Sequence, residues 1–218
     1  MHRHLVLLAT LFSLSVVSLA YAGFEDGQEA YESGDYVRAY KEFRTLAEQG
    51  NVEAQLRLAL MYDEGRGVSK NVSEAVKWFR KAADRGSVEA QLQLGLMYDE
   101  GQGVPKNTFE AVKWFRKAAE QGMAEAQYNL GVMYHEGQGV PKDYAEVLKW
   151  LSKAAKQGLA DAQNNLGVMY AKGEGVPQDL VQAYMWFNLA AVRGNQKAQK
   201  YKDKVAEQMT SSLYFWAF

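Results

Sequence analysis

The 218-residue chain has no cysteine, only three prolines and a formal net charge of −1. Without cysteine, no disulfide, thiol nucleophile, thiolate metal ligand or lipid anchor on an N-terminal cysteine is available. A charge balance this close to zero provides no electrostatic surface for nucleic acid or for an anionic membrane, so we expect neither as a partner. The fold must therefore be stabilised by packing alone.

Residues 1–22 differ from the rest of the chain and have the composition of a secretory signal peptide. His2, Arg3 and His4 precede an apolar run over residues 5–19, which is followed by Ala20-Tyr21-Ala22, an A-x-A cleavage signal. This run is shorter than the roughly 20 apolar residues that a membrane span needs, so a retained anchor is the weaker alternative and stable membrane insertion is not expected. We predict an exported protein, periplasmic or secreted, that begins at residue 23 after cleavage.

One stretch of aromatic, basic and small residues returns at a constant interval through the chain. It begins with a tryptophan, and the step from each tryptophan to the next is 36 residues: Trp78, Trp114, Trp150 and Trp186. A fixed period between about 20 and 50 residues is typical of stacked-repeat proteins, in which each copy packs on its neighbours. We predict an all-α fold, an α/α superhelical solenoid of stacked helix-turn-helix repeats.

Each copy has the apolar spacing of two amphipathic helices with a glycine-rich connection. In residues 90–125, Gly101 and Gly103 are suited to end the first helix with positive φ, and Pro105 discourages its continuation. Asn107 is a good N-cap for the second helix, and Glu110 is spaced to close a capping box. The other copies carry the same pairs, Asn71 with Glu74, Asp143 with Glu146, and Asp179 with Gln182.

A second set of glycines lies inside the first helix of three copies. A glycine within a helix costs about 1 kcal/mol relative to alanine, so its recurrence at one interior position needs a reason. We expect another helix to cross closely at Gly95, Gly131 and Gly167, with no room for a β-carbon; Ala59 is the equivalent residue of the first copy.

The repeat motif, A-x(3)-LG-x-MY-x(2)-G-x-GVP-x-[DN]-x(3)-A-x(2)-WF-x-KAA-x(2)-G, resembles that of the Sel-1-like repeat family, which is related to the tetratricopeptide repeats. The resemblance covers four copies over residues 54–197, and residues 23–53 resemble a tetratricopeptide-like helix pair that caps the array. It implies a right-handed superhelix that serves as a protein-binding adaptor, commonly in bacterial cell-envelope or secreted proteins. Some cysteine-rich exported members are reported to bind or hydrolyse β-lactams, and this chain lacks their cysteines.

Residues 198–218 form the last segment, a predicted C-terminal helix and an apolar tail. After Met209, Thr210 or Ser211 is placed to cap a short second helix, and five of the last six residues are large and apolar. We expect this tail either to fold back on the face left open by residues 198–209 or to mediate self-association. A truncated or altered reading frame is the alternative explanation, and the oligomeric state is left open.

The predicted binding surface consists of first-helix positions that differ between copies. By analogy with the tetratricopeptide groove, the resemblance implies that first helices line a concave face on which asparagines clamp an extended peptide. Asparagine both donates to and accepts from a peptide unit, which suits this role. A merely solvated helix face is the alternative. The expected groove residues are Arg57, Gln93, Tyr128, Asn129, His135, Asn164 and Asn165.

We interpret the other candidate catalytic, metal-binding and stacking residues as structural. His135 is the only histidine after the signal peptide, and without cysteine it makes a poor zinc site, so we expect a solvated helix-end residue rather than a general base or metal ligand. The helix-end acids lack EF-hand spacing, so we predict no metal site and no cofactor. We expect the four tryptophans above to pack in the core of the repeats and not to form a stacking platform for sugars or bases. The same holds for the recurring tyrosines Tyr62, Tyr98, Tyr134 and Tyr170.

These observations predict a non-catalytic scaffold that binds an extended segment of a partner protein. The alternative is a cell-envelope hydrolase acting on peptidoglycan or a β-lactam. Neither a G-x-S-x-G nor an S-x-x-K sequence occurs after residue 22, and a single histidine supports no Ser/His/acid set, so we expect no catalytic residues.

Overall fold

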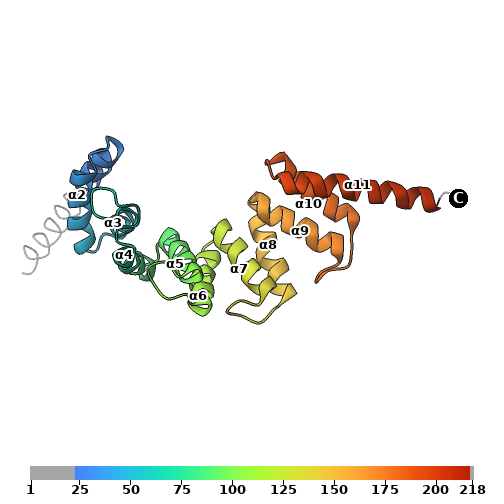
Figure 1. The fold of residues 1–218 in the computed structure, drawn as a ribbon, viewed down its shortest axis with the longest axis horizontal. Helices are drawn as coiled ribbons and strands as arrows, with labels where there is room; N and C mark the ends of the chain where they lie inside the picture. Colours follow the sequence, from blue (N-terminus) through green and yellow to red (C-terminus); the bar gives the residue numbers. More distant parts are fainter. Residues whose placement is uncertain (1–22, 217–218) are drawn as a thin grey trace, which may run out of the picture. The chain divides into compact units, whose positions relative to one another are not determined.

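The computed structural model describes residues 23–216, with side chains up to Thr210; the predicted signal peptide and residues 217–218 lie outside this part. Within it, all regular secondary structure is α-helical (Figure 1). A helix over residues 23–32 is followed by α2 (Tyr36–Glu48), α3 (Val52–Glu64), α4 (Val72–Asp84), α5 (Val88–Glu100), α6 (Thr108–Glu120), α7 (Ala124–Glu136), α8 (Tyr144–Lys156), α9 (Ala160–Lys172), α10 (Leu180–Val192) and α11 (Gln196–Trp216).

The helices form two compact units, divided between Lys106 and Asn107. In the first unit α2 packs on α3, α3 on α4 and α4 on α5, and in the second unit each helix from α6 to α10 packs on the next one in the chain. Packing between consecutive helices is the arrangement expected of antiparallel pairs joined by short loops. The predicted all-α solenoid of stacked helix-turn-helix repeats is therefore confirmed.

The predicted helix ends are confirmed at both sides of the glycine-rich connection. The first helices end at Gly65, Gly101, Gly137 and Gly173, all in the left-handed region with φ between 72° and 77°. The second helices begin after side-chain N-caps that accept a hydrogen bond from a backbone N–H of the first turn. These caps are Asn71, Asn107, Asp143 and Asp179.

The reciprocal half of the predicted capping box is not formed. The N–H of Asn71 already donates to the carbonyl of Tyr62 at 2.8 Å, and that of Asp179 donates to Tyr170 at 2.9 Å. In the three copies with a glutamate three residues after the N-cap, that carboxylate pairs with a lysine instead. Lys149 Nζ lies 2.8 Å from Glu146 Oε1, and this hydrogen bond is the largest cause that lowers the pKa of Glu146.

The second glycine of each connection has a role beyond ending a helix. Gly139 has a φ of 67°, and a β-carbon on it would lie 2.4 Å from the carbonyl oxygen of Thr108. A β-carbon on Gly67 would lie 2.0 Å from the carbonyl oxygen of Tyr36. Both carbonyls belong to the first residue of the second helix of the preceding pair. Each glycine therefore lets one helix pair approach the backbone of the pair before it.

Two of the interior glycines, Gly131 and Gly167, lie at close helix crossings, as predicted. A β-carbon on Gly131 would lie 3.0 Å from the side chain of Leu151, and one on Gly167 would lie 2.6 Å from the ring of Phe187. Leu151 and Phe187 are buried residues of the following helix. The missing side chain therefore makes room for the aromatic or aliphatic core of the same repeat.

The repeated aromatic residues lie in or beside the core. Trp114 and Trp150 are only 3% exposed, whereas Trp78 and Trp186 are half-buried. Lysine ammonium groups lie over three of the indole rings, for example Lys117 Nζ at 4.0 Å from the ring centre of Trp114. Rings that are buried or covered in this way leave little open surface for stacking. Tyr98 and Tyr134 are buried, and Tyr62 and Tyr170 are half-buried.

A buried glutamine, which the sequence analysis missed, joins successive helix pairs. Gln127 Nε2 donates to the carbonyl oxygen of Ala119 at 3.1 Å, and Gln157 Nε2 donates to Gln127 Oε1 at 2.9 Å. Three other buried glutamines make the same bond. Each donates its Nε2 to the backbone carbonyl oxygen eight residues earlier in the chain: Gln55, Gln91 and Gln163. The 36-residue recurrence of glutamine beside apolar positions was the signal that could have revealed it.

The C-terminal segment differs from the prediction. Helix α11 runs without interruption to Trp216, so the chain does not reverse at Thr210 or Ser211 and the expected fold-back of the tail is wrong. The Thr210 hydroxyl donates to the carbonyl oxygen of Ala206 at 2.9 Å, the bond by which threonine is accommodated inside a helix. Among the described residues, no helix is both long enough and apolar enough to cross a membrane.

Candidate functional site

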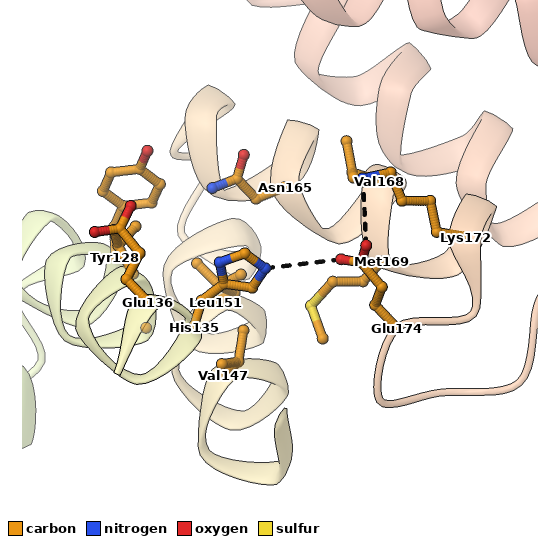
Figure 2. Close-up of a pocket in the computed structure, with 12 residues that line it drawn as sticks. Tyr128, His135, Glu136, Val147, Leu151, Asn165, Val168, Met169, Lys172 and Glu174 are labelled. Carbon is orange, nitrogen blue, oxygen red and sulfur yellow. Dashed lines mark ion pairs between the residues drawn. The ribbon is translucent and has the colours of Figure 1, made fainter. Parts of the chain in front are cut away.

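A cavity of about 270 Å³ lies in the second unit between α7, α8 and α9 (Figure 2). It faces the C-terminal half of α7 and the corresponding half of α9, which are the first helices of two successive repeats. Its walls come from Tyr128, Gly131, Val132, His135, Glu136, Val147, Leu151, Asn165, Val168, Met169, Lys172 and Glu174. The site therefore exists only because two repeats are stacked.

The floor of the cavity is apolar because it is part of the repeat core. Val147, Leu151 and Met169 are buried and belong to the hydrophobic faces of α8 and α9. Gly131 contributes no side chain above Leu151, which leaves space at this point. A floor of this kind binds an apolar group by excluding water and offers it no hydrogen bond.

The rim carries polar and charged groups that meet at Glu174, a residue of the loop between α9 and α10. His135 Nε2 lies 3.7 Å from Glu174 Oε2, and Lys172 Nζ lies 3.2 Å from Glu174 Oε1 (Figure 2). The His135 ring also meets the Tyr144 ring edge to face, with the centroids 6.0 Å apart. His135 is thus an exposed helix-end residue, as predicted, but it also connects two repeats at the mouth of the cavity.

The opposite side of the rim combines a phenol with an amide. Burial raises the pKa of the Tyr128 hydroxyl, the nearby charge of Asp161 raises it further, and a hydrogen bond with the Asn165 side chain lowers it in part. The hydroxyl therefore stays protonated at neutral pH and is able to donate a hydrogen bond. Tyr128 and Asn165 come from different repeats, so both first helices contribute polar groups to the same rim.

The structure brings together three of the predicted groove residues and separates others. Tyr128, His135 and Asn165 line the cavity, whereas Asn129 is half-buried and does not line it. The placement of Asn164 in the groove is wrong, because its side chain is buried, only 8% exposed, and its amide donates to Asn165 Oδ1 at 3.3 Å. Its equivalents Leu56 and Leu92 are buried as well, whereas Tyr128, at the same position of the third repeat, is half-buried.

Arg57 and Gln93 belong to the first unit and form a separate depression. They line a shallow hollow of about 320 Å³ together with Leu56, Leu60, Glu53 and Glu89. Arg57 Nε lies 3.3 Å from Glu53 Oε1 within the same helix. Arg57 and Gln93 therefore lie on one surface of the first unit. The predicted first-helix face has one part in this unit and another part in the second unit.

Lys172 and Glu174 are rim residues that sequence reasoning missed. Glu174 lies between the loop glycines Gly173 and Gly175, at a position where the earlier copies have Arg66, Gln102 and Gln138. A comparison of loop positions between copies would have marked this residue, because only the last copy has a carboxylate there. In the part of the chain that the structure describes, no group of three or more histidine, aspartate or glutamate residues is placed to hold a metal ion.

The Sel1 repeat profile matches residues 52–87, 88–123, 124–159 and 160–195. The chain belongs to the Sel1 repeat family. Sel1 repeat proteins are commonly protein-interaction scaffolds and are typically non-catalytic. Neither the structure nor the family lends support to the hydrolase alternative.

Two solved structures show the same Sel1 repeat fold at substantial identity. The structure of c5321, a protective antigen present in uropathogenic Escherichia coli strains, is 40% identical over 89% of this chain, with a TM-score of 0.82. A Sel1 repeat protein from Oxalobacter formigenes is 39% identical over 82% of this chain and 74% of its own, with a TM-score of 0.78. The chain spans only 43% of the c5321 structure. No match was found among curated proteins.

Proposed function

We propose that this Sel1 repeat protein is an exported scaffold that binds an extended segment of a partner protein on its first-helix face, anchored in the cavity between α7 and α9. The observation that carries the proposal is an apolar floor surrounded by polar side chains from two successive repeats. The cavity volume of about 270 Å³ is below the roughly 300–1,000 Å³ of most small-molecule sites, which favours one protein side chain as its occupant.

The chemistry of the rim favours a peptide as the ligand. An extended peptide presents N–H and C=O groups on either side of each side chain, and a side chain pointing into a pocket gives specificity. Asn165 supplies an amide that both donates and accepts, and Tyr128 supplies a hydroxyl. The ligand that fits is an extended segment whose apolar side chain fills the cavity while its backbone bonds to these two groups.

Filling the cavity should abolish peptide binding without unfolding the chain. Val132→Trp places a large ring at the half-buried wall of the cavity, so peptides selected from a random display library on the parent protein should bind this variant at least about tenfold more weakly. Phe109→Trp, at an exposed position of α6 outside the first-helix face, is the control and should bind normally. Asn165→Ala should weaken binding by about 1–3 kcal/mol through a lost hydrogen bond, and Asn129→Ala by less.

Calorimetric titration with the selected peptide gives these affinities, and helical circular dichroism checks that each variant is folded. Equal affinities for the parent protein and Val132→Trp would remove the cavity from the binding site. Equal losses for Val132→Trp and Phe109→Trp would show that the effect is not specific to this cavity.

Export is the second component of the proposal, and it rests on the sequence of residues 1–22. The relative c5321 is a protective antigen, which is consistent with an exported protein. Protein purified from the envelope or medium of an expressing bacterium should begin at Gly23 when its N-terminus is sequenced. Purified protein that retains residues 1–22 and remains inside the cell would contradict export and leave the binding proposal untouched.

A further inference from the structure

The outward face of α10 is apolar, whereas the equivalent face of the other second helices is charged. Helices α4, α6 and α8 each contain four or five charged residues, and α10 contains none. Met185 stands where the earlier copies have Lys77, Lys113 and Lys149, and Leu189 stands where they have Lys81, Lys117 and Lys153. The last repeat has therefore lost the lysines that lie over the tryptophan in the others.

These substitutions create a continuous exposed stripe. Met185 is 48% exposed, Leu189 is 40% exposed and Val192 is 78% exposed, and Val181 and Tyr184 are exposed beside them. The spacing of residues 181, 185, 189 and 192 places them on one side of the helix. The buried residues Ala183, Phe187 and Ala190 lie on the other side, against α9 and α11. We refer to Val181, Tyr184, Met185, Leu189 and Val192 as the α10 stripe.

A continuous apolar stripe on the exposed face of a helix marks an interaction surface, because scattered apolar residues and not rows of them are usual on a free surface. We infer that the α10 stripe is the interface of a homodimer, in which two copies of this chain pair α10 with α10 in antiparallel orientation. The partner is thus a second copy of the same chain.

Charge supports a second copy as the partner. In a two-fold interface each residue near the axis faces its own copy, so any charge there meets the same charge. If α4, α6 or α8 paired with its own copy, lysines of one chain would face lysines of the other. Helix α10 has no charged residue, so its pairing with a second α10 brings no like charges together. Antiparallel pairing brings Met185 of one copy near Leu189 of the other, and the spacing of three and four residues suits helix packing.

Polarity and size favour the same partner. Homodimer interfaces are more apolar than non-obligate interfaces. The stripe is apolar in the same way, because the Tyr184 hydroxyl is its one polar side-chain group. A helix of 13 residues is roughly 20 Å long and 10 Å across, so the paired stripes fall at the low end of interface size, below about 1,200 Å² in total. The dimer is therefore weak and depends on concentration.

Light scattering and sedimentation of the purified chain test this interface. Between about 1 and 200 µM the mass should rise from monomer toward dimer. The double variant Met185→Lys/Leu189→Lys restores the lysines of the other repeats, so it should keep the helical circular dichroism and weaken the dimer at least about tenfold. Phe109→Lys, which removes an exposed apolar residue of α6 outside the stripe, is the matched control and should leave the dimer intact.

A charge exchange tests the pairing of α10 with α10 directly. Met185→Glu/Leu189→Glu should be monomeric alone and should form a heterodimer when mixed with Met185→Lys/Leu189→Lys, because opposite charges then face each other. Deleting residues 211–218 should leave the dimer intact. A chain that stays monomeric at about 200 µM would overturn the homodimer and leave the stripe to a different protein. A dimer that survives the lysine pair but is lost on the deletion would also overturn it, in favour of the C-terminal tail.

Discussion

Replacing Gly139 by alanine is expected to lower the free energy of unfolding by about 3 kcal/mol or more. Two penalties add at this residue. Its φ of 67° is a left-handed conformation that costs a residue with a β-carbon about 1–2 kcal/mol. The new methyl group would also lie 2.4 Å from the carbonyl oxygen of Thr108, a backbone atom that moves only if the helix pair separates from its neighbour. Overpacking of this kind costs about a further 1–3 kcal/mol.

Gly122→Ala is the matched control for this substitution. Gly122 lies in the same unit and has a φ of 99°, but a β-carbon there would meet no atom within 4 Å. It should therefore show the conformational cost alone. Urea unfolding of both variants, followed by circular dichroism, gives the difference. Equal losses for the two variants would mean that the contact between successive helix pairs at Gly139 does not constrain the fold.

Gly131→Val should destabilise the second unit by a few kcal/mol. The branched side chain enters the crossing of α7 and α8, where even a β-carbon would lie 3.0 Å from Leu151, so the core must shift. Gly131→Ala should be much milder, because alanine gains about 1 kcal/mol in helix propensity and Leu151 need move only slightly. In the first repeat Ala59 occupies the equivalent position and is fully buried.

Gly167 provides an internal comparison for this prediction. A β-carbon there would lie 2.6 Å from the ring of Phe187, which is itself fully buried, so Gly167→Ala should cost more than Gly131→Ala. Thermal and urea unfolding of the three variants would establish the order. A melting temperature of Gly131→Val equal to that of the parent would contradict the close crossing.

The repeat period predicted the helices because it marks the same residues in four copies. The glycine that ends each first helix recurs because the backbone there needs a positive φ, and the N-cap recurs because its side chain accepts a backbone hydrogen bond. The loops between first and second helices could therefore be predicted from the sequence alone. The period does not say what those residues contact. The close approach of Gly139 to Thr108 lies between residues 31 positions apart and depends on how two helix pairs stack.

The predicted site was partly wrong for a related reason. Variation between copies marks positions that are free to differ, and it does not separate positions facing solvent from positions facing a neighbouring repeat. Asn164 is buried, whereas Tyr128, at the same position one repeat earlier, is half-buried and lines the cavity. Conversely, Glu174 is in a loop that appeared to serve only as a connection, so its contact with His135 required the three-dimensional arrangement.

The continuous α11 shows the limit of local signals. Thr210 and Ser211 are good N-cap residues, and the sequence therefore predicted a break before them. The structure instead turns the Thr210 hydroxyl back to the carbonyl of Ala206, which satisfies its donor without ending the helix. A capping residue marks a helix start only where the preceding residues leave the helical conformation.

The measurement that tests the binding proposal most directly is site-specific photo-crosslinking in cells that produce the protein. A photoreactive phenylalanine analogue replaces Val132 at the wall of the cavity in one strain and Phe109 on the outer surface of α6 in another. The proposal predicts an adduct with one partner protein from position 132, competed by the peptide selected on the purified protein, and no such adduct from position 109. The same adduct from position 109, or one from position 132 that the peptide does not compete, would contradict binding in the α7–α9 cavity.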